Sequence, residues 1–300
     1  MRAIVVGGSG QIGGWLLRVL AERGHEATGT YRTAPYPGLV RLDASEGAEA
    51  AGWLRDRRPD VVFYPAGFTW VDGCEREPGL ARSANLDQPL TLARASADAG
   101  ARFVYFSTDY VFDGEVGPYD ERSATKPLSA YGRSKLDAER ALADLLGDRG
   151  LTVRTSWVFG PERQGKNFAY QLVRHLARGD ALGCPSDQVS SPSYGPDVAR
   201  AAVALVESGT SGLIHVAGPE VTGRVEFARA IAGAFDLDPS RIVGRTTAEL
   251  GQGAPRPLRG GLRTARPDAL PPGSVRGLAD ALADFRARLV AGEGWAVPTA

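Results

Sequence analysis

Three glycines near the start of the chain restrict its fold more than any other feature. The stretch VVGGSGQIGG places Gly7, Gly10 and Gly13 at three-residue spacing, after an apolar run and before an amphipathic segment. Glycines at a strand-to-helix turn allow a tight bend and close approach of a diphosphate, which the helix N-terminus attracts. The pattern predicts a dinucleotide-binding βαβ unit. The alternative is a glycine-rich turn that holds no ligand.

Short apolar runs alternate with helical patterns over the first half of the chain. Strands are expected at residues 3–7, 26–31, 60–67, 102–108 and 151–160, and helices at 11–24, 43–58, 79–99 and 130–146, with a kink near Pro89. This order is typical of a doubly wound α/β fold with a parallel sheet. We predict a Rossmann domain at 1–160, completed by a strand near 212–217, and a smaller substrate-binding lobe over most of 161–300. That lobe is expected to contain helices at 224–235 and 275–291 and an irregular stretch at 251–274.

The end of the second predicted strand bears on the choice of cofactor. Enzymes that use NAD commonly place an acidic residue there to bind the ribose hydroxyls, whereas this chain has Tyr31 and Arg32. A guanidinium suits a 2′-phosphate, so NADPH is favoured, with NADH as the alternative. Arg32 could also be an ordinary surface arginine. Asp43 is placed to meet the adenine or to cap the next helix.

A tyrosine and a lysine stand four residues apart in the stretch SAYGRSK. The chain has 35 basic residues, yet only three are lysines, and one of them is Lys135 after Tyr131. On a helix the two side chains share a face, where an ammonium would lower the pKa of the phenol. Thr108 and Asp109 end a preceding buried strand, where parallel sheets bind ligands. The alternatives are a solvated helix face for the pair and a turn cap for Thr108.

Several stretches together resemble the extended short-chain dehydrogenase/reductases, and most closely the dTDP-4-dehydrorhamnose reductases. They run through nearly the whole chain: GGSGQIG, FTWVDGCE, STDYVFDG, PLSAYGRSKLDAE, RTSWVFGP, GKNF, DQVSSPSYGPDVA and RPLRGGLRTARPDAL. The resemblance implies NADPH-dependent reduction of the C4 ketone of a nucleotide-diphosphate 4-keto-6-deoxysugar, most simply dTDP-linked, in deoxysugar biosynthesis.

The resemblance also implies roles for individual residues. Thr108 would bind the substrate carbonyl, Tyr131 would give the proton, and Lys135, supported by Asn85, would hold the ribose. The expected substrate-binding residues are Thr108, Asp109, Trp157, Asn167 and Gln188, although Trp157 could be plain core and Asn167 only a helix cap. The expected cofactor-binding residues are Gly7, Gly10, Gln11, Ile12, Gly13, Tyr31, Arg32, Asp43, Ala66, Gly67, Tyr131 and Lys135.

Composition argues against several other classes of protein. Thirty-five acidic residues balance 35 basic ones, which removes the usual charge of a nucleic-acid binder. No apolar stretch is long enough to span a membrane and no signal peptide is evident, so we expect a cytoplasmic protein. Some relatives hold magnesium between subunits through glutamates, but the first of these falls near Trp15. We therefore expect no metal, and a homodimer stays open.

Three other activities have to be weighed. Sugar 4,6-dehydratases carry a basic glutamate where this chain has Tyr110, which argues for simple ketone reduction. A sugar-nucleotide epimerase would use the same triad with a retained cofactor. The chain also resembles the regulatory β subunit of methionine adenosyltransferase, a non-catalytic NADP-binding protein. Turnover of a 4-keto sugar nucleotide would separate that subunit from an enzyme.

Overall fold

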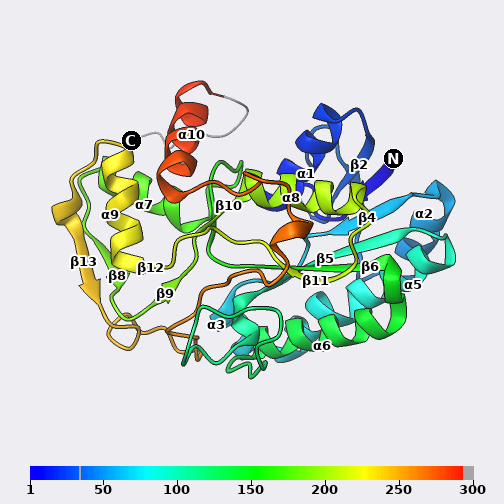
Figure 1. Ribbon diagram of the computed structural model, residues 1–300, viewed down its shortest axis with the longest axis horizontal. Helices are drawn as coiled ribbons and strands as arrows, with labels where there is room; N and C mark the ends of the chain where they lie inside the picture. The colour runs from blue at the N-terminus through cyan, green and yellow to red at the C-terminus, as the bar shows by residue number, and fades with distance from the viewer. Residues whose placement is uncertain (34, 293–300) are drawn as a thin grey trace.

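A seven-stranded parallel sheet forms the centre of the molecule (Figure 1). The computed structural model describes residues 1–33 and 35–292. The strand order is β11-β6-β5-β4-β1-β2-β3. The strands are β1 (Arg2–Val5), β2 (Glu26–Tyr31), β3 (Val40–Arg41), β4 (Val61–Tyr64), β5 (Arg102–Thr108), β6 (Gly150–Thr155) and β11 (Gly212–His215). The predicted doubly wound fold is thereby confirmed.

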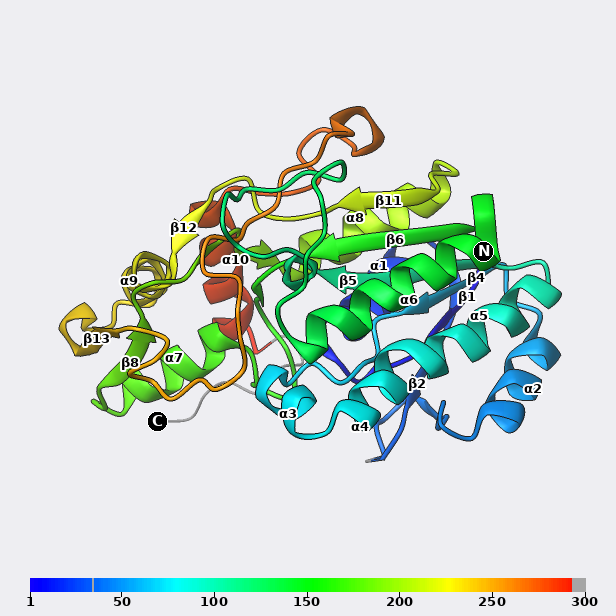
Figure 2. The same ribbon diagram turned by 90° about the horizontal axis from the view of Figure 1, so that it is seen from below.

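Helices cover both faces of this sheet, as Figures 1 and 2 show. One face packs against α1 (Gln11–Glu22) and α8 (Gly195–Glu207), through a core that includes Leu16, Leu20 and Val203. The other face packs against α2 (Gly47–Arg57), α5 (Gln88–Asp98) and α6 (Ala130–Leu146). The central strands β1, β4 and β5 are therefore covered on both faces, which explains their nearly continuous apolar sequences.

The strand order reverses next to the first strand, and this reversal creates a crevice. From β1 the chain moves outward to β2 and β3, and it then returns to pair β4 with the opposite side of β1. Crossovers therefore leave β1 in opposite directions and separate beyond the carboxyl ends of β1 and β4. Open parallel sheets bind their ligands at such a switch point.

A smaller lobe has its own core beside this edge of the sheet. Its helices are α7 (Phe168–Ala177), α9 (Arg224–Ala234) and α10 (Leu278–Val290), which pack together around Tyr170, Phe227 and Phe285. Its short strand pairs are β7 (Val158–Phe159) with β10 (Ser193–Tyr194), β8 (Leu182–Pro185) with β13 (Ile242–Arg245), and β9 (Val189–Ser190) with β12 (Thr222–Gly223). The predicted lobe ran to residue 300, of which 293–300 lie outside the described residues.

Some element predictions were wrong in detail. The helix expected at 43–58 begins at Gly47, so Asp43 does not cap it. The segment expected as one helix kinked near Pro89 is α4 (Pro78–Arg82), a π-helical turn at Ser83–Asp87 and then α5, in which Pro89 occupies the tolerant first turn. The strand expected at 151–160 divides into β6 and β7, because Trp157 has a φ of 40°.

The remaining helical turns are short. They are α3 (Val71–Arg76) and 3₁₀ turns at Asp109–Val111, Gly147–Arg149, Pro239–Arg241 and Pro267–Ala269. For α7 the sequence indicates only a possible cap at Asn167, without bounds, and for α8 it indicates no helix, although α8 belongs to the layer that covers the sheet. No helix within the described residues is both long and apolar enough to cross a bilayer.

Candidate active site

The glycine turn depends on a positive φ at Gly7 and on a close approach between the backbones of Gly7 and Gly13. Gly7 has a φ of 90°, a value that glycine adopts without strain. A Cβ on Gly13 would lie 2.1 Å from the carbonyl oxygen of Gly7, so no side chain fits there. Gly10 is the N-cap of α1, and Gln11 and Ile12 form its first turn. The turn therefore presents bare backbone N–H groups at the crevice, as a diphosphate requires.

Arg32 and Asp43 lie near each other beyond the end of β2. Arg32 is exposed, and its charge helps to lower the pKa of Asp43. The larger cause is the side chain of Ser45, whose hydroxyl donates to Asp43 Oδ1 at 2.6 Å. Asp43 thus closes a local turn with one carboxylate oxygen. The guanidinium of Arg32, next to Tyr31, is exposed and provides a basic group at this end of the crevice.

Tyr131 and Lys135 are presented by the first turns of α6. Ser129 caps this helix by accepting a hydrogen bond from Gly132 N at 3.1 Å, and Glu75 accepts one from Ala130 N at 2.5 Å. Tyr131 is buried, and burial raises the pKa of its hydroxyl, although a hydrogen bond with Thr108 opposes the rise. The phenol is therefore held in its protonated form at neutral pH.

Lys135 lies one turn further along α6 and is 4% exposed. Its Nζ lies 4.0 Å from the ring centroid of Tyr105, a cation–π contact from the neighbouring strand β5. Burial lowers the pKa of Lys135 to about 7, while the carboxylate of Glu139 partly opposes that change. We expected the lysine to lower the pKa of Tyr131. In this structure burial dominates instead, and it lowers the charge of the lysine as well.

Thr108 and Asp109 form the end of β5 on the same side. The Thr108 hydroxyl accepts a hydrogen bond from Tyr110 N at 3.2 Å, so it does cap the turn that follows. It also donates to Asp109 Oδ1 at 3.3 Å, and Ser190 Oγ donates to Asp109 Oδ2 at 2.7 Å. Burial raises the pKa of Asp109 to about 6. Asp109 therefore joins this edge of the sheet to the smaller lobe.

Asn85 is fully buried and connects the end of β4 to α6. Its Oδ1 accepts from Phe68 N at 2.8 Å, and its Nδ2 donates to Phe68 O at 3.0 Å and to Ser134 Oγ at 3.1 Å. It lies in the π-helical turn, a deviation that is frequent at functional sites. Its support of Lys135 is therefore indirect, through the adjacent Ser134. A Cβ on Gly67 would lie 2.8 Å from Asn85 Oδ1.

Two predicted substrate-binding residues, Asn167 and Gln188, use their side-chain amides in hydrogen bonds within the smaller lobe. Asn167 caps α7 through Tyr170 N, and its Nδ2 donates to Gly160 O and Glu162 Oε1. The amide nitrogen of Gln188 donates to Thr247 Oγ1 at 3.0 Å and to Gln252 Oε1 at 2.9 Å. For Asn167 the structure thus shows the helix cap that the sequence offered as the alternative.

Trp157, the third predicted substrate-binding residue of this lobe, has a strained backbone and is held by contacts of its ring. Its backbone occupies the left-handed region, which costs on the order of 1–3 kcal/mol and is often found at ligand sites. Its ring stacks on Phe227 with centroids 6.2 Å apart, and the guanidinium carbon of Arg224 lies 3.4 Å from its ring centroid. Trp157 is partly buried and therefore belongs both to the core of the lobe and to its surface.

Comparison with known proteins places this geometry in a family. The model of the RmlD substrate binding domain matches residues 1–289. A dTDP-4-dehydrorhamnose reductase from Burkholderia thailandensis is 36% identical over 276 residues, which cover 86% of this chain and 88% of the relative. The chain belongs to the dTDP-4-dehydrorhamnose reductase family. The resemblance seen in the sequence is thereby confirmed.

A further relative and a solved structure are also similar to this chain over nearly its whole length. The probable low-salt glycan biosynthesis reductase Agl14 of Haloferax volcanii is 34% identical over 267 residues, covering 86% of this chain and 88% of the relative. The crystal structure of the Bacillus anthracis enzyme of the family, solved with NADP, superposes with a TM-score of 0.87 at 27% identity. It covers 96% of this chain and 99% of that one.

The residues present fit a nicotinamide dinucleotide. At the carboxyl ends of β5 and β6 the buried hydroxyls of Ser107 and Thr155 find no hydrogen-bond partner among the described residues. Unpaired buried hydroxyls are uncommon, and here they lie on neighbouring strands at the ligand edge of the sheet. Ala66 approaches the glycine turn, with its Cβ 3.0 Å from the position that a Gly7 Cβ would take.

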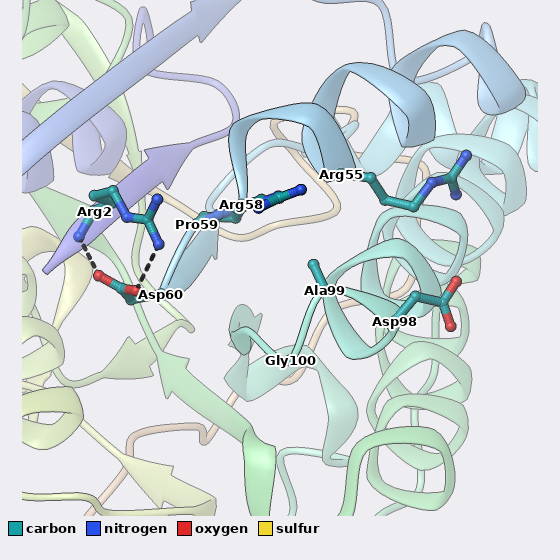
Figure 3. Close-up of a pocket in the computed structure, with 8 residues that line it drawn as sticks. All are labelled: Arg2, Arg55, Arg58, Pro59, Asp60, Asp98, Ala99 and Gly100. Atoms are coloured by element: carbon teal, nitrogen blue, oxygen red, sulfur yellow. Dashed lines mark hydrogen bonds and ion pairs between the residues drawn. The ribbon is translucent and has the colours of Figure 1, made fainter.

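Two further places in the molecule have to be considered as ligand sites. The first is Trp15, near which the resemblance places a magnesium-binding glutamate, and the second is a polar cavity at the far end of the sheet. Trp15 is buried and donates from Nε1 to Pro161 O at 2.8 Å. Among the described residues no group of three or more His, Cys, Asp or Glu could hold a metal ion. A polar cavity of about 590 Å³ lies at the start of β1 and β4, where Arg2 pairs with Asp60 beside Arg55 and Arg58 (Figure 3). It is at the end of the sheet opposite the glycine turn.

Sequence reasoning missed several residues of the site. Tyr105 was read only as part of a buried strand, yet its ring faces Lys135 and its hydroxyl donates to Asn85 O at 2.7 Å. Arg224 was read only as the start of a helix, yet it lies on Trp157. Tyrosine in an otherwise apolar strand was a usable signal, because a buried hydroxyl needs a partner. For Arg224 no such local signal exists.

Replacing Asn85 by alanine should destabilise the protein by about 2–4 kcal/mol, because two backbone groups of Phe68 would lose their partner. Urea unfolding followed by circular dichroism would measure the change. Gln88→Ala in the same helical run removes a single hydrogen bond, to Ser83, and should cost clearly less. Equal losses in the two variants would contradict the proposed bracing of α6 by Asn85.

Proposed function

We propose that this protein uses NADPH to reduce the C4 ketone of a nucleotide-diphosphate 4-keto-6-deoxysugar, most simply one linked to dTDP. The observation that carries the proposal is the contact of Tyr131 with Thr108, with Lys135 one turn further along α6, at the carboxyl edge of the sheet that also carries the glycine turn. Family membership supports the same reaction, since the relatives named above are reductases and one was solved with NADP.

The residues of the site divide the chemistry between them. NADPH, when bound, supplies the hydride that reduces the carbonyl carbon. On substrate binding the Thr108 hydroxyl would turn from Asp109 to the carbonyl oxygen, and Tyr131 would donate to the same oxygen, where negative charge grows in the transition state. Tyr131 then gives its proton to that oxygen, which becomes the C4 hydroxyl. The ammonium of Lys135 stabilises the phenolate that remains, and it holds the ribose hydroxyls.

The protonation states found in the structure suit the direction of reduction. A proton donor must carry its proton before the reaction, and burial keeps Tyr131 protonated. The alkoxide formed from the ketone is a strong base, so the transfer remains favourable despite the raised pKa of the phenol. Tyr110, whose ring lies edge-on to Tyr131 with centroids 5.6 Å apart, stands where dehydratases place a basic glutamate. It supplies no carboxylate for dehydration.

The direct test is turnover of nucleotide-diphosphate 4-keto-6-deoxysugars with NADPH, followed by NADPH absorbance and by product stereochemistry. Net oxidation of NADPH with formation of a 4-hydroxyl sugar would support the proposal. Sugar interconversion without net oxidation of NADPH would indicate an epimerase. NADPH binding with no reduction of any 4-keto sugar would favour the regulatory-subunit alternative.

Arg32→Ala should shrink the preference for NADPH over NADH about tenfold, because loss of a phosphate contact costs about 1.4 kcal/mol. Fluorescence titration of the two cofactors would give the ratio of their Kd values. Arg41→Ala is a matched control, since Arg41 on β3 is also exposed and also lowers the pKa of Asp43, but its guanidinium pairs with Glu46. Equal affinity of the unmodified protein for both cofactors would refute the assignment.

A further inference from the structure

The first residue of α9 carries a guanidinium that is packed between aromatic rings. Arg224 is partly buried, and its guanidinium carbon lies 3.4 Å from the ring centroid of Trp157 and 4.7 Å from that of Phe168. Burial lowers its pKa to about 10, so it remains charged at neutral pH. A cation is thus fixed in the smaller lobe by the strained Trp157.

Three other arginines that are buried or partly buried have a carboxylate partner, whereas Arg224 has no hydrogen-bond acceptor among the described residues. Arg154, Arg256 and Arg276 pair with Glu139, Asp72 and Asp197 respectively. Within residues 1–33 and 35–292 no carboxylate lies within 4.0 Å of the Arg224 guanidinium, and its side chain donates no hydrogen bond. Five N–H donors in a half-buried place are costly to leave unpaired. The Arg224 guanidinium would therefore be stabilised by an anion that binds from outside the chain.

Stacking leaves the donors of Arg224 usable. The aromatic rings contact the face of the planar guanidinium, whereas its N–H bonds lie in the plane and point outward. An anion can therefore approach the edge of the fork while the stacking is kept. A planar fork of this kind matches two oxygens of a phosphate group.

Arg224 is also close to the reacting end of the site. Arg224 N donates to Gln188 O at 2.9 Å, and β12, which ends at Gly223, pairs with β9, whose Ser190 donates to Asp109 Oδ2 at 2.7 Å. The charge of Arg224 accordingly lowers the pKa of Asp109, the residue that directly follows Thr108. In a nucleotide sugar, one hexose ring and the anomeric oxygen separate the C4 ketone from the diphosphate. A cation next to the residues that follow Thr108 can therefore meet the diphosphate when the ketone is bound at Thr108.

We propose that Arg224, held against Trp157, binds the diphosphate of the nucleotide-sugar substrate and so positions the hexose for reduction. This assignment rests on the proposed function and names a substrate-binding residue for it. The phosphate oxygens would supply the acceptors that the described chain does not provide. The strain at Trp157 would be maintained because its ring is the surface on which the guanidinium rests.

The test is dTDP binding by calorimetry in the presence of NADP⁺, for the unmodified protein and for Arg224→Met. Methionine keeps an unbranched apolar side chain against Trp157 but removes the charge and the donors. We expect dTDP to bind about 10–100-fold more weakly, as for loss of a charged hydrogen-bonded pair. The KM for the keto-sugar nucleotide should rise in the same proportion, with kcat changed by less than about threefold.

Two further variants separate this role from a structural one. Arg224→Lys keeps the charge without the fork and should recover part of the affinity. Arg229→Met removes an exposed arginine from the same helix and should leave dTDP binding unchanged. Unchanged dTDP affinity in a folded Arg224→Met protein would overturn the assignment, as would failure of the unmodified protein to bind dTDP, UDP or GDP.

The outcomes also distinguish this proposal from the proposed function. Arg224-dependent binding of dTDP without reduction of any ketone would uphold the anion site and reject the reductase activity. Reduction of the ketone with a normal KM in Arg224→Met would support the reductase activity and reject Arg224 as the diphosphate-binding residue. A carboxylate on the hexose is the other anion that could meet Arg224. A loss confined to UDP-glucuronic acid, with UDP-glucose unaffected, would therefore overturn the diphosphate assignment.

Discussion

Replacing Tyr131 by phenylalanine is expected to lower kcat by roughly 10²–10⁴ while NADPH affinity stays nearly unchanged. The substitution keeps the ring, which is buried in a cluster with Cys74 and Ala81, and removes only the hydroxyl. Hydride transfer would then leave the ketone oxygen with one hydrogen-bond donor, Thr108, and no nearby acid. Steady-state kinetics with a 4-keto sugar nucleotide, together with NADPH titration, would measure both quantities.

Tyr110→Phe provides the matched control for this experiment. Its ring is the edge-on neighbour of Tyr131, so the variant also loses one buried hydroxyl at the same place. We expect its kcat to stay within about tenfold of the unmodified protein, because Tyr110 is not assigned a proton. Reduction at the original rate by Tyr131→Phe would show that another group supplies the proton.

The parts of the fold that the sequence predicts well are those in which local pattern and burial agree. The strands Glu26–Tyr31 and Arg102–Thr108 and the helix Ala130–Leu146 begin and end where expected, since each has a clear boundary in the sequence. Ser129 is a strong N-cap, and Gly147 ends the helix with a φ of 51°. The alternation of strands and helices then predicts a parallel sheet, without fixing the order of its strands.

Most of the features that escaped prediction depend on contacts between distant segments, and one depends on a competing local hydrogen bond. Trp157 turns the chain out of β6 only because the smaller lobe receives its ring, next to Phe227. Asp43 was read as a helix cap, but Ser45 competes for its carboxylate and forms a turn earlier in the chain. The site of Arg224 is assembled from residues that are tens of positions apart, so periodicity gives no indication of it.

The same distinction holds for the candidate site. A Tyr-x-x-x-Lys pair and a strand-terminal Thr108 can be found from spacing alone, because helix and strand geometry brings them to one edge. The pKa values cannot be found in this way. An ammonium beside a phenol was expected to lower the pKa of Tyr131, but burial of both groups outweighs it. Electrostatics at this site is decided by desolvation, which depends on the complete fold.

The buried ammonium of Lys135 leads to the second large effect. Lys135→Met should lower kcat about 10²-fold or more and also weaken NADPH binding, because the charge stabilises the Tyr131 phenolate and the amine holds the ribose. Loss of affinity together with turnover would distinguish this variant from Tyr131→Phe. A variant that kept normal NADPH affinity would show that Lys135 does not contact the cofactor.

The same variant should change how stability depends on pH. In the folded protein the pKa of Lys135 is about 7, below its ordinary value of 10.5. Above about pH 7 the unfolded chain therefore holds a proton at this residue that the folded protein releases, so stability rises with pH. Relative to Lys135→Met, the ligand-free unmodified protein should gain up to about 1.4 kcal/mol per pH unit as the pH rises from about 7 to about 8.5.

Urea unfolding over this pH range, without cofactor, would measure the difference. Burial raises the pKa of Cys74 and of Cys184 to about 11 in the folded protein, so titration of the unfolded thiols also affects stability near pH 8.5, but it does so equally in both proteins and cancels in the difference. Lys126→Met is the control, since Lys126 is exposed and its raised pKa keeps it charged throughout the range in both states. If the unmodified protein and Lys135→Met gave parallel profiles, Lys135 would be charged in the folded protein, and burial would not control the proton balance of the site.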